Sequence, residues 1–146
     1  MPNFDTKNIE LVKGKQCFLQ LVIIPDKEDA GERGSSDEKI GADGVLDIYE
    51  KNLEKKYQSS FRGLLATMNR VANLYPVSKD KFRDITPQNA TTSEYEFKFQ
   101  DLRIYAIKIP NGQLVLLGGY KNQQDKDFKK FRSLKDQYLE SLKKKK

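Results

Sequence analysis

The segment that most constrains the fold of this 146-residue chain is 102–122, LRIYAIKIPNGQLVLLGGYKN. Two short apolar runs flank Asn111-Gly112, and both residues of that pair tolerate positive φ. The pattern predicts a β-hairpin. The almost unbroken apolar run after the turn predicts a strand that is covered on both faces. Arg103 and Lys121 are not needed to fill a core, so they raise the question of whether the hairpin lines a site.

Further strands are expected at 17–25 and 94–100. The first, CFLQLVIIP, is rich in β-branched residues and stops at a proline, which is typical of a buried strand. The second, EYEFKFQ, alternates strictly between aromatic and polar residues, which predicts a half-buried strand. The Gly-Gly pair at 118–119 is expected to leave room for another backbone to approach the end of the last strand.

Helical spacing of apolar residues begins at Val45 and continues to about 72, which predicts one long helix or a helical hairpin broken near NLEKKYQSS. Asp125 is a suitable N-cap for a final helix whose apolar stripe includes Tyr138. Residues 77–93 are expected to be mostly loop. The order is strand, loop, helices, three strands and helix, which indicates an α+β fold with helices grouped against an antiparallel sheet.

The chain is expected to form a single domain over 1–146. Within it, 1–16 is interpreted as an N-terminal extension and 26–44 as a charged flexible loop, because it is rich in Gly, Ser and charged residues. The run KKKK at 143–146 is interpreted as a basic tail.

The composition limits the possible chemistry. Histidine is absent, so any catalysis would rest on Lys, Arg, Tyr, Asp or Glu, and no metal or cofactor is expected. The single cysteine, Cys17, lies beside an apolar run and is interpreted as a core residue. The sequence contains no run of about 20 apolar residues and no visible secretory signal, so we expect a cytoplasmic protein that does not enter a membrane.

The net charge of +6 is unevenly distributed. Residues 1–73 contain 11 Lys and Arg against 12 Asp and Glu, whereas 74–146 contain 16 against 9. This asymmetry favours an anionic partner, nucleic acid first. The alternative is that the terminal lysines are only a solvated tail.

These residues resemble a known family. The segment YEFKFQDLRIYAIKIPNGQLVLLGGYKN and the Lys-rich helix after it are similar to the RelE/ParE/HigB superfamily of bacterial type II toxin–antitoxin toxins, over about 94–140. The resemblance implies a helical hairpin packed on a small, twisted antiparallel sheet with a C-terminal helix, the RelE-like toxin fold. RelE- and HigB-like members cleave mRNA on the ribosome without a metal, whereas ParE-like members inhibit DNA gyrase. A cognate antitoxin, encoded adjacently, is the implied partner, and we expect oligomers only through it.

The candidate catalytic residues are Arg103 and Lys121, which the resemblance implies, and Lys98, a basic residue of the expected sheet. Arg103 matches a phosphate-contacting arginine, although an ion pair with Glu96 on the neighbouring strand is the structural alternative. Lys121 matches a basic position that contacts phosphate. Lys98 is a candidate base, or simply a solvated lysine.

Three further residues, Tyr105, Tyr120 and Arg83, are candidate RNA-binding residues. Tyr105 would either stack on a base or pack in the core. The expected acid–base residue near the C-terminus is missing, since the last helix contains only Tyr138, and NQQ at 122–124 replaces an expected arginine. A non-catalytic relative therefore stays open as an alternative, as a gyrase inhibitor or an RNA- or protein-binding module, and so does a small α+β domain of another kind.

Overall fold

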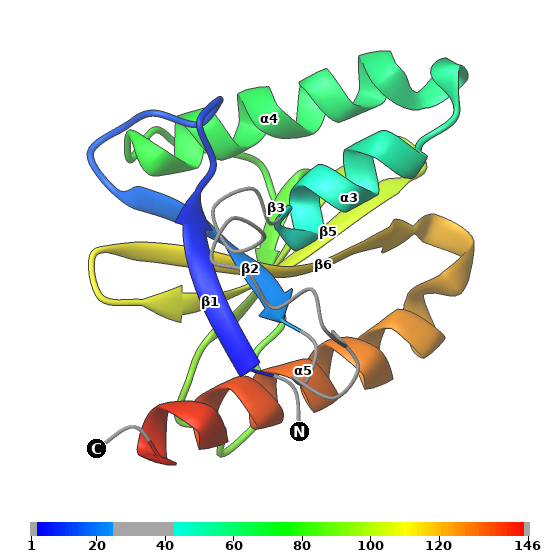
Figure 1. Cartoon of the computed structure of the whole chain (residues 1–146). Coiled ribbons are helices and arrows are strands. Elements are labelled where there is room, and N and C mark those ends of the chain that lie inside the picture. The colour runs from blue at the N-terminus through cyan, green and yellow to red at the C-terminus, as the bar shows by residue number, and fades with distance from the viewer. Residues whose placement is uncertain (1–2, 25–42, 145–146) are drawn as a thin grey trace.

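A six-stranded sheet carries helices on both of its faces in the computed structural model, which describes residues 3–24 and 43–144 (Figure 1). The strands are β1 (Asn3–Asn8), β2 (Cys17–Ile24), β3 (Phe82–Asp84), β4 (Glu94–Phe99), β5 (Leu102–Ile109) and β6 (Gly112–Tyr120). The helices are α3 (Val45–Asn52), α4 (Gln58–Ala72) and α5 (Gln124–Lys144), with short 3-10 turns η2 (Lys55–Tyr57) and η3 (Lys121–Gln123). Most of the expected loop 26–44 and the end of the basic tail lie outside the described residues.

The strand order is β1-β2-β6-β5-β4-β3. Every neighbouring pair is antiparallel except β2 and β6, which run parallel over Cys17–Gln20 and Gly112–Val115. The α+β class is confirmed, but the expectation of a purely antiparallel sheet is wrong. The segment between β2 and β6, which includes α3, α4 and strands β3 to β5, provides the long connection that a parallel pair needs.

Two strands were not predicted from the sequence. Strand β1 lies in the segment interpreted as an N-terminal extension, and β3 lies in the segment interpreted as loop. Strand β1 has one buried side chain, Phe4, and β3 has only three residues. Neither strand therefore contains enough apolar residues to produce a recognisable alternation.

The apolar core has a layer on each face of the sheet. Helices α3 and α4 cover one face, which we call the α4 face, and α5 covers the other, the α5 face (Figure 1). Val115 of β6 packs in the α4 layer and Leu114 and Leu116 pack in the α5 layer. The prediction that this strand is covered on both faces is confirmed. Full burial of each such side chain stabilises the fold by roughly 1.5–3 kcal/mol.

The helical hairpin, rather than one long helix, forms between Val45 and Ala72. Leu53 ends α3 in an extended conformation (φ −74°, ψ 134°), and η2 then leads into α4. The last helix begins at Gln124, so Asp125 lies in its first turn rather than at its N-cap. Within the described residues, no helix is long and apolar enough to cross a bilayer.

Candidate nucleic-acid interface

The α5 face of the sheet brings Lys98 and Arg103 together. They are direct cross-strand partners on β4 and β5, and Gly119 of β6 continues the same row. Like charges that lie opposite each other on a sheet repel. Among the described residues, neither side chain has a carboxylate partner. An anion near this pair would relieve the repulsion.

Arg103 is only 7% exposed. Its Nη1 donates to the backbone oxygens of Gln100, at 2.6 Å, and Leu102, at 2.8 Å. Its Nε is buried and has no hydrogen-bond partner among the described residues. The guanidinium therefore lies against the β4–β5 turn, with one donor left unsatisfied.

The ion pair with Glu96 that was the structural alternative for Arg103 is made by Arg83 instead. Arg83 Nε lies 2.7 Å from Glu96 Oε1, and Gln124 Nε2 donates to Glu96 Oε2 at 2.7 Å. Glu96 is fully buried, whereas the Arg83 side chain is 44% exposed. Arg83 is thus held in place by one carboxylate while part of it remains accessible to a ligand.

Tyr105 is completely buried beneath α5. Its ring centroid lies 5.4 Å from that of Phe128 and 5.6 Å from that of Phe131. Its hydroxyl makes no hydrogen bond of normal geometry among the described residues, although the Gln124 side chain lies close enough to lower its pKa; burial outweighs this and raises the pKa above the usual value, with a smaller contribution from Glu96. The ring packs in the core, so a base cannot stack on it in this structure.

Two charged residues of α5 hold this helix on the sheet. Glu94 of β4 accepts from Arg132 Nε, at 3.1 Å, and from Lys135 Nζ, at 2.7 Å. Glu94 and Glu96 are both fully buried, so the prediction of a half-buried β4 with a solvated polar face is wrong. Arg132 and Lys135 are three positions apart and therefore lie on one face of the helix, which is the sequence signal that could have revealed this contact.

The Gly-Gly pair makes room for side chains rather than for another backbone. A Cβ on Gly118 would lie 2.5 Å from Cγ of Tyr49, and a Cβ on Gly119 would collide with the Asp127 carboxylate. Tyr49 also donates from its hydroxyl to the Gly119 carbonyl at 2.7 Å. Burial raises the pKa of the Asp127 carboxyl, one oxygen of which has no hydrogen-bond partner among the described residues.

Tyr120 and Lys121 lie apart from the Lys98–Arg103 pair. The Tyr120 ring is on the α4 face, 5.5 Å from the Tyr57 ring. Lys121 is exposed, and its backbone N–H donates to the Asp101 carbonyl at 2.8 Å. Both residues line a surface hollow that also contains the acidic residues Glu54 and Asp101.

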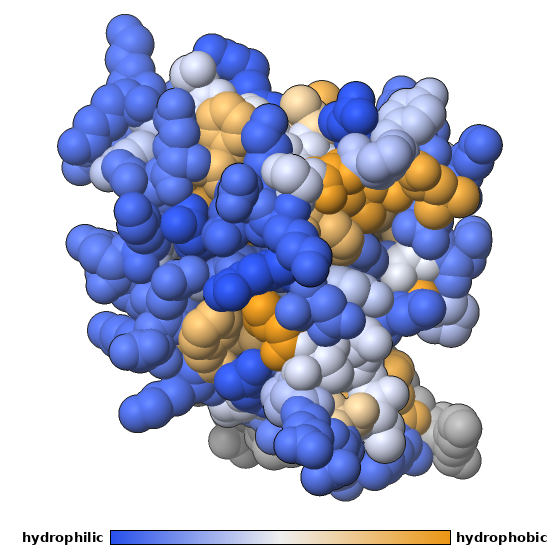
Figure 2. Space-filling model, turned by 180° about the vertical axis from the view of Figure 1, so that it is seen from behind, coloured by the Kyte–Doolittle hydropathy of each residue, from blue (hydrophilic) through white to orange (hydrophobic). Residues whose placement is uncertain are grey.

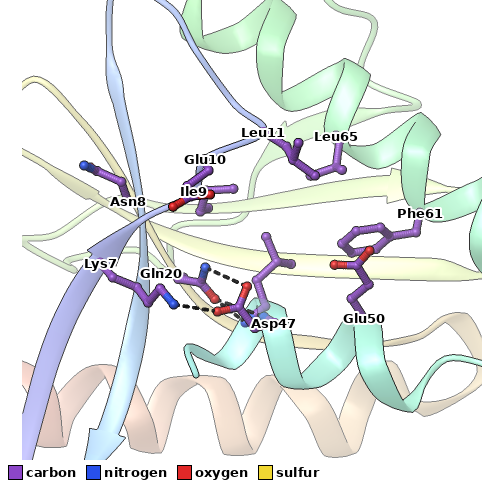
Figure 3. Close-up of a pocket in the computed structure, with 11 residues that line it drawn as sticks. Lys7, Asn8, Ile9, Glu10, Leu11, Gln20, Asp47, Glu50, Phe61 and Leu65 are labelled. Atoms are coloured by element: carbon purple, nitrogen blue, oxygen red, sulfur yellow. Dashed lines mark hydrogen bonds and ion pairs between the residues drawn. The ribbon is translucent and has the colours of Figure 1, made fainter. Parts of the chain in front are cut away.

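A second hollow lies at the start of α3, where Lys7, Gln20 and Asp47 point toward one another (Figure 3). Gln20 Oε1 accepts the N–H groups of Leu46 and Asp47, each at 3.0 Å. Gly44 has no side chain to cap the helix, so Gln20 of β2 supplies the acceptor. The Asp47 carboxylate accepts from Gln20, at 3.2 Å, and from Lys7, at 3.0 Å. This cluster is satisfied internally and acts as a helix cap.

The six candidate residues therefore do not form a single site but lie on different faces of the sheet. Lys98, Arg103 and Arg83 share the α5 face, Tyr105 is buried on it, Tyr120 lies on the α4 face, and Lys121 follows the end of β6. Of these six candidates, the accessible basic groups on and beside the α5 face are Lys98, Arg83 and Lys121. These groups can bind phosphate. The same set lacks an accessible aromatic residue.

The described residues contain no group of three or more His, Cys, Asp or Glu side chains that could hold a metal ion. Cys17 is a half-buried free thiol. In the comparisons with known proteins, no family model, no curated protein and no solved structure matches the chain.

Proposed function

We propose that this chain is the toxin of a type II toxin–antitoxin pair, of the RelE/HigB type, and that it acts on ribosome-bound mRNA through the α5 face of its sheet. The proposal rests on the resemblance over 94–140. The single structural observation that carries it is the pairing of Lys98 with Arg103, which have no neutralising carboxylate among the described residues. A phosphate of RNA provides the missing negative charge.

Metal-free RNA cleavage needs three contributions. The 2′-hydroxyl must lose a proton, the charge on the phosphate must be stabilised, and the leaving 5′-oxygen must gain a proton. We assign phosphate stabilisation to Arg103, with Lys98 as the candidate base, and Lys121, which lies apart from this pair, would contact a neighbouring part of the RNA. Tyr105 is left out of this scheme because it is buried.

The first test is induction of the chain in a bacterial host, with growth and primer extension on a cellular message as the readouts. We expect growth arrest and new 5′ ends, and both should be lost in Lys98→Ala and Arg103→Ala. Lys129→Ala is the control, since Lys129 is an exposed lysine on α5. Full growth at verified expression, without new 5′ ends, would remove the proposal.

The second candidate is a non-catalytic relative on the same scaffold. The observation that favours it is the position of Arg103, whose guanidinium donates to the carbonyls of Gln100 and Leu102 and lies almost entirely out of solvent. This candidate predicts growth arrest without RNA cleavage, as for a gyrase inhibitor, or RNA or protein binding without arrest. Gyrase supercoiling assays with the purified chain distinguish the first case from the second.

The proposed partner is an antitoxin encoded next to this chain. Co-expression with the product of the adjacent reading frame should restore growth, and the two proteins should co-purify. A neighbouring frame that neither binds the chain nor relieves arrest would argue against the toxin assignment.

A further inference from the structure

A hollow on the α4 face lies where helix α4 stops short of the edge of the sheet. Helix α4 ends at Ala72, close to the β5–β6 turn, and the sheet beyond it is not covered by the helix (Figure 1). The hollow is lined by side chains of four strands and by the residues that follow α4. The members that matter here are Tyr75, Phe82, Tyr95, Lys108 and Gln113.

Two aromatic rings form one wall of this hollow. Phe82 of β3 and Tyr95 of β4 are stacked, with centroids 5.3 Å apart and planes 29° apart, and both are half-buried. Tyr75, just after α4, is 58% exposed. Figure 2, the view from behind, shows apolar side chains gathered in patches on an otherwise hydrophilic surface. Flat aromatic surface on an open sheet is the feature on which unstacked nucleobases are held.

The amide of Gln113 gives the hollow a polar group without a partner. Gln113 is only 5% exposed, and its Oε1 is buried with no hydrogen bond within the described residues. Its Nε2 donates no hydrogen bond within those residues, so a half-turn of the amide would exchange the two ends without breaking a contact. A buried amide left unpaired costs roughly 1–3 kcal/mol. The end of the amide that faces the hollow can be paired by a donor or an acceptor on the edge of a nucleobase, whichever way the amide is turned.

The charges around the hollow are positive. Lys108 is exposed and is the cross-strand neighbour of Gln113. Arg70 lies over the Tyr75 ring, 5.5 Å from its centroid, and donates to the Pro76 carbonyl at 3.2 Å. No carboxylate is among the described residues that line the hollow. The aromatic rings favour a planar ligand, and the positive charges favour one that is negatively charged.

We propose that this hollow binds a nucleobase of single-stranded RNA. The base packs against the Tyr75 and Tyr95 rings, its edge pairs with the Gln113 amide, and Lys108 contacts a phosphate. The site is on the opposite face of the sheet from Lys98 and Arg103, so it goes beyond the proposed function. It holds whether or not the chain cleaves RNA.

The test uses the purified full-length chain and a fluorescein-labelled, single-stranded RNA of eight nucleotides of mixed sequence. Anisotropy gives the affinity, and NMR follows the side-chain amide of Gln113 during the titration. We expect this resonance to shift with RNA and not with inorganic polyphosphate, which has the charge but no bases. Tyr75→Ala, at an exposed position, should weaken binding about tenfold. Gln113→Leu and Lys108→Gln should weaken it as well.

Lys129→Gln on α5 makes the same charge change as Lys108→Gln at another exposed position and should bind RNA as the wild type does. Circular dichroism melts of each variant verify that it is folded. The proposal is overturned if the Gln113 amide does not move at saturating RNA, or if polyphosphate moves it equally. It is also overturned if Tyr75→Ala binds normally while Lys98→Gln and Lys121→Gln abolish binding.

Discussion

Glu94 and Lys135 form an ion pair in which both members are buried, with 2.7 Å between Oε2 and Nζ and side-chain exposures of 1% and 9%. Lys135 Nζ also donates to the Thr92 carbonyl at 2.9 Å. The pair joins the C-terminal half of α5 to β4. It is one reason why the polar side of β4 is covered rather than solvated.

Removal of the lysine should destabilise the fold strongly. Lys135→Met leaves a buried carboxylate whose one remaining ion-pair partner among the described residues is Arg132, and loss of one member of a buried pair typically costs about 3–5 kcal/mol. We expect the free energy of unfolding, measured by urea denaturation, to fall by about 3 kcal/mol. Lys129→Met, at an exposed position of the same helix, should change it by less than about 0.5 kcal/mol. Equal effects of the two variants would show that the pair contributes nothing.

The two glycines of β6 should differ in their tolerance of a methyl group. Gly118→Ala places Cβ against the ring of Tyr49, which is packed between α3 and the sheet, whereas Gly119→Ala meets the end of the Asp127 side chain. Overpacking of this kind typically costs about 1–3 kcal/mol. We expect Gly119→Ala to regain stability when it is combined with Asp127→Ala, and Gly118→Ala to gain nothing from the same change. Thermal unfolding of the five variants tests this, and additive effects at Gly119 and Asp127 would contradict it.

The free energy of unfolding should fall at acid pH, because protonation of Asp47 removes the charge of a stabilising carboxylate. Burial alone raises the pKa of this carboxyl, but hydrogen bonds from the Gly44 N–H, Lys7 and Gln20 outweigh it and hold the pKa below 3.8. A depressed folded-state pKa gives stability that is present above the unfolded value and is lost as pH falls through the folded value. Asp47→Asn should therefore be less stable than the wild type at pH 7, and the gap in urea midpoint should narrow toward pH 3. A gap of constant size would show that the charge of Asp47 does not matter.

The hydroxyl of Tyr105 should be dispensable. It is buried without a hydrogen-bond partner among the described residues, so Tyr105→Phe removes an unsatisfied polar group and keeps the ring against Phe128 and Phe131. We expect stability to be unchanged or to rise by about 1 kcal/mol, with growth arrest on induction the same as for the wild type. Loss of arrest in a stably folded Tyr105→Phe variant would return this tyrosine to the candidate site.

The central strands and the helices were predictable because their periodicity is local. The hairpin at Asn111-Gly112 and the aromatic alternation of β4 are patterns of adjacent residues. The parallel pairing of β2 with β6 is not local, since nothing in either strand specifies a partner so distant in sequence. The polar strand β1 has only Phe4 as a buried residue, so it has no apolar pattern to recognise.

The sequence predicted which types of residue the candidate site contains, but not which of them are accessible to a ligand. The sequence places Arg103 and Tyr105 on one face of one strand and Lys98 on the polar side of another, and only the strand register brings Lys98 onto the same face. Whether that face is open depends on α5, and its position depends on the buried contacts of Glu94 with Arg132 and Lys135. An acidic residue in an alternating strand is normally taken as solvent-facing. The burial of Tyr105 therefore could not be predicted from β5 alone.

The parallel pairing of β2 with β6 determines when the chain can complete its fold. Phe18 pairs with Gln113, so the first two strands cannot join the sheet until most of the polypeptide has left the ribosome. Until then the apolar segment CFLQLVII has β1 as its only strand neighbour among the described residues, and distant pairings of this kind form slowly. Truncation before β6 would therefore remove the strand that joins β1 and β2 to the rest of the sheet.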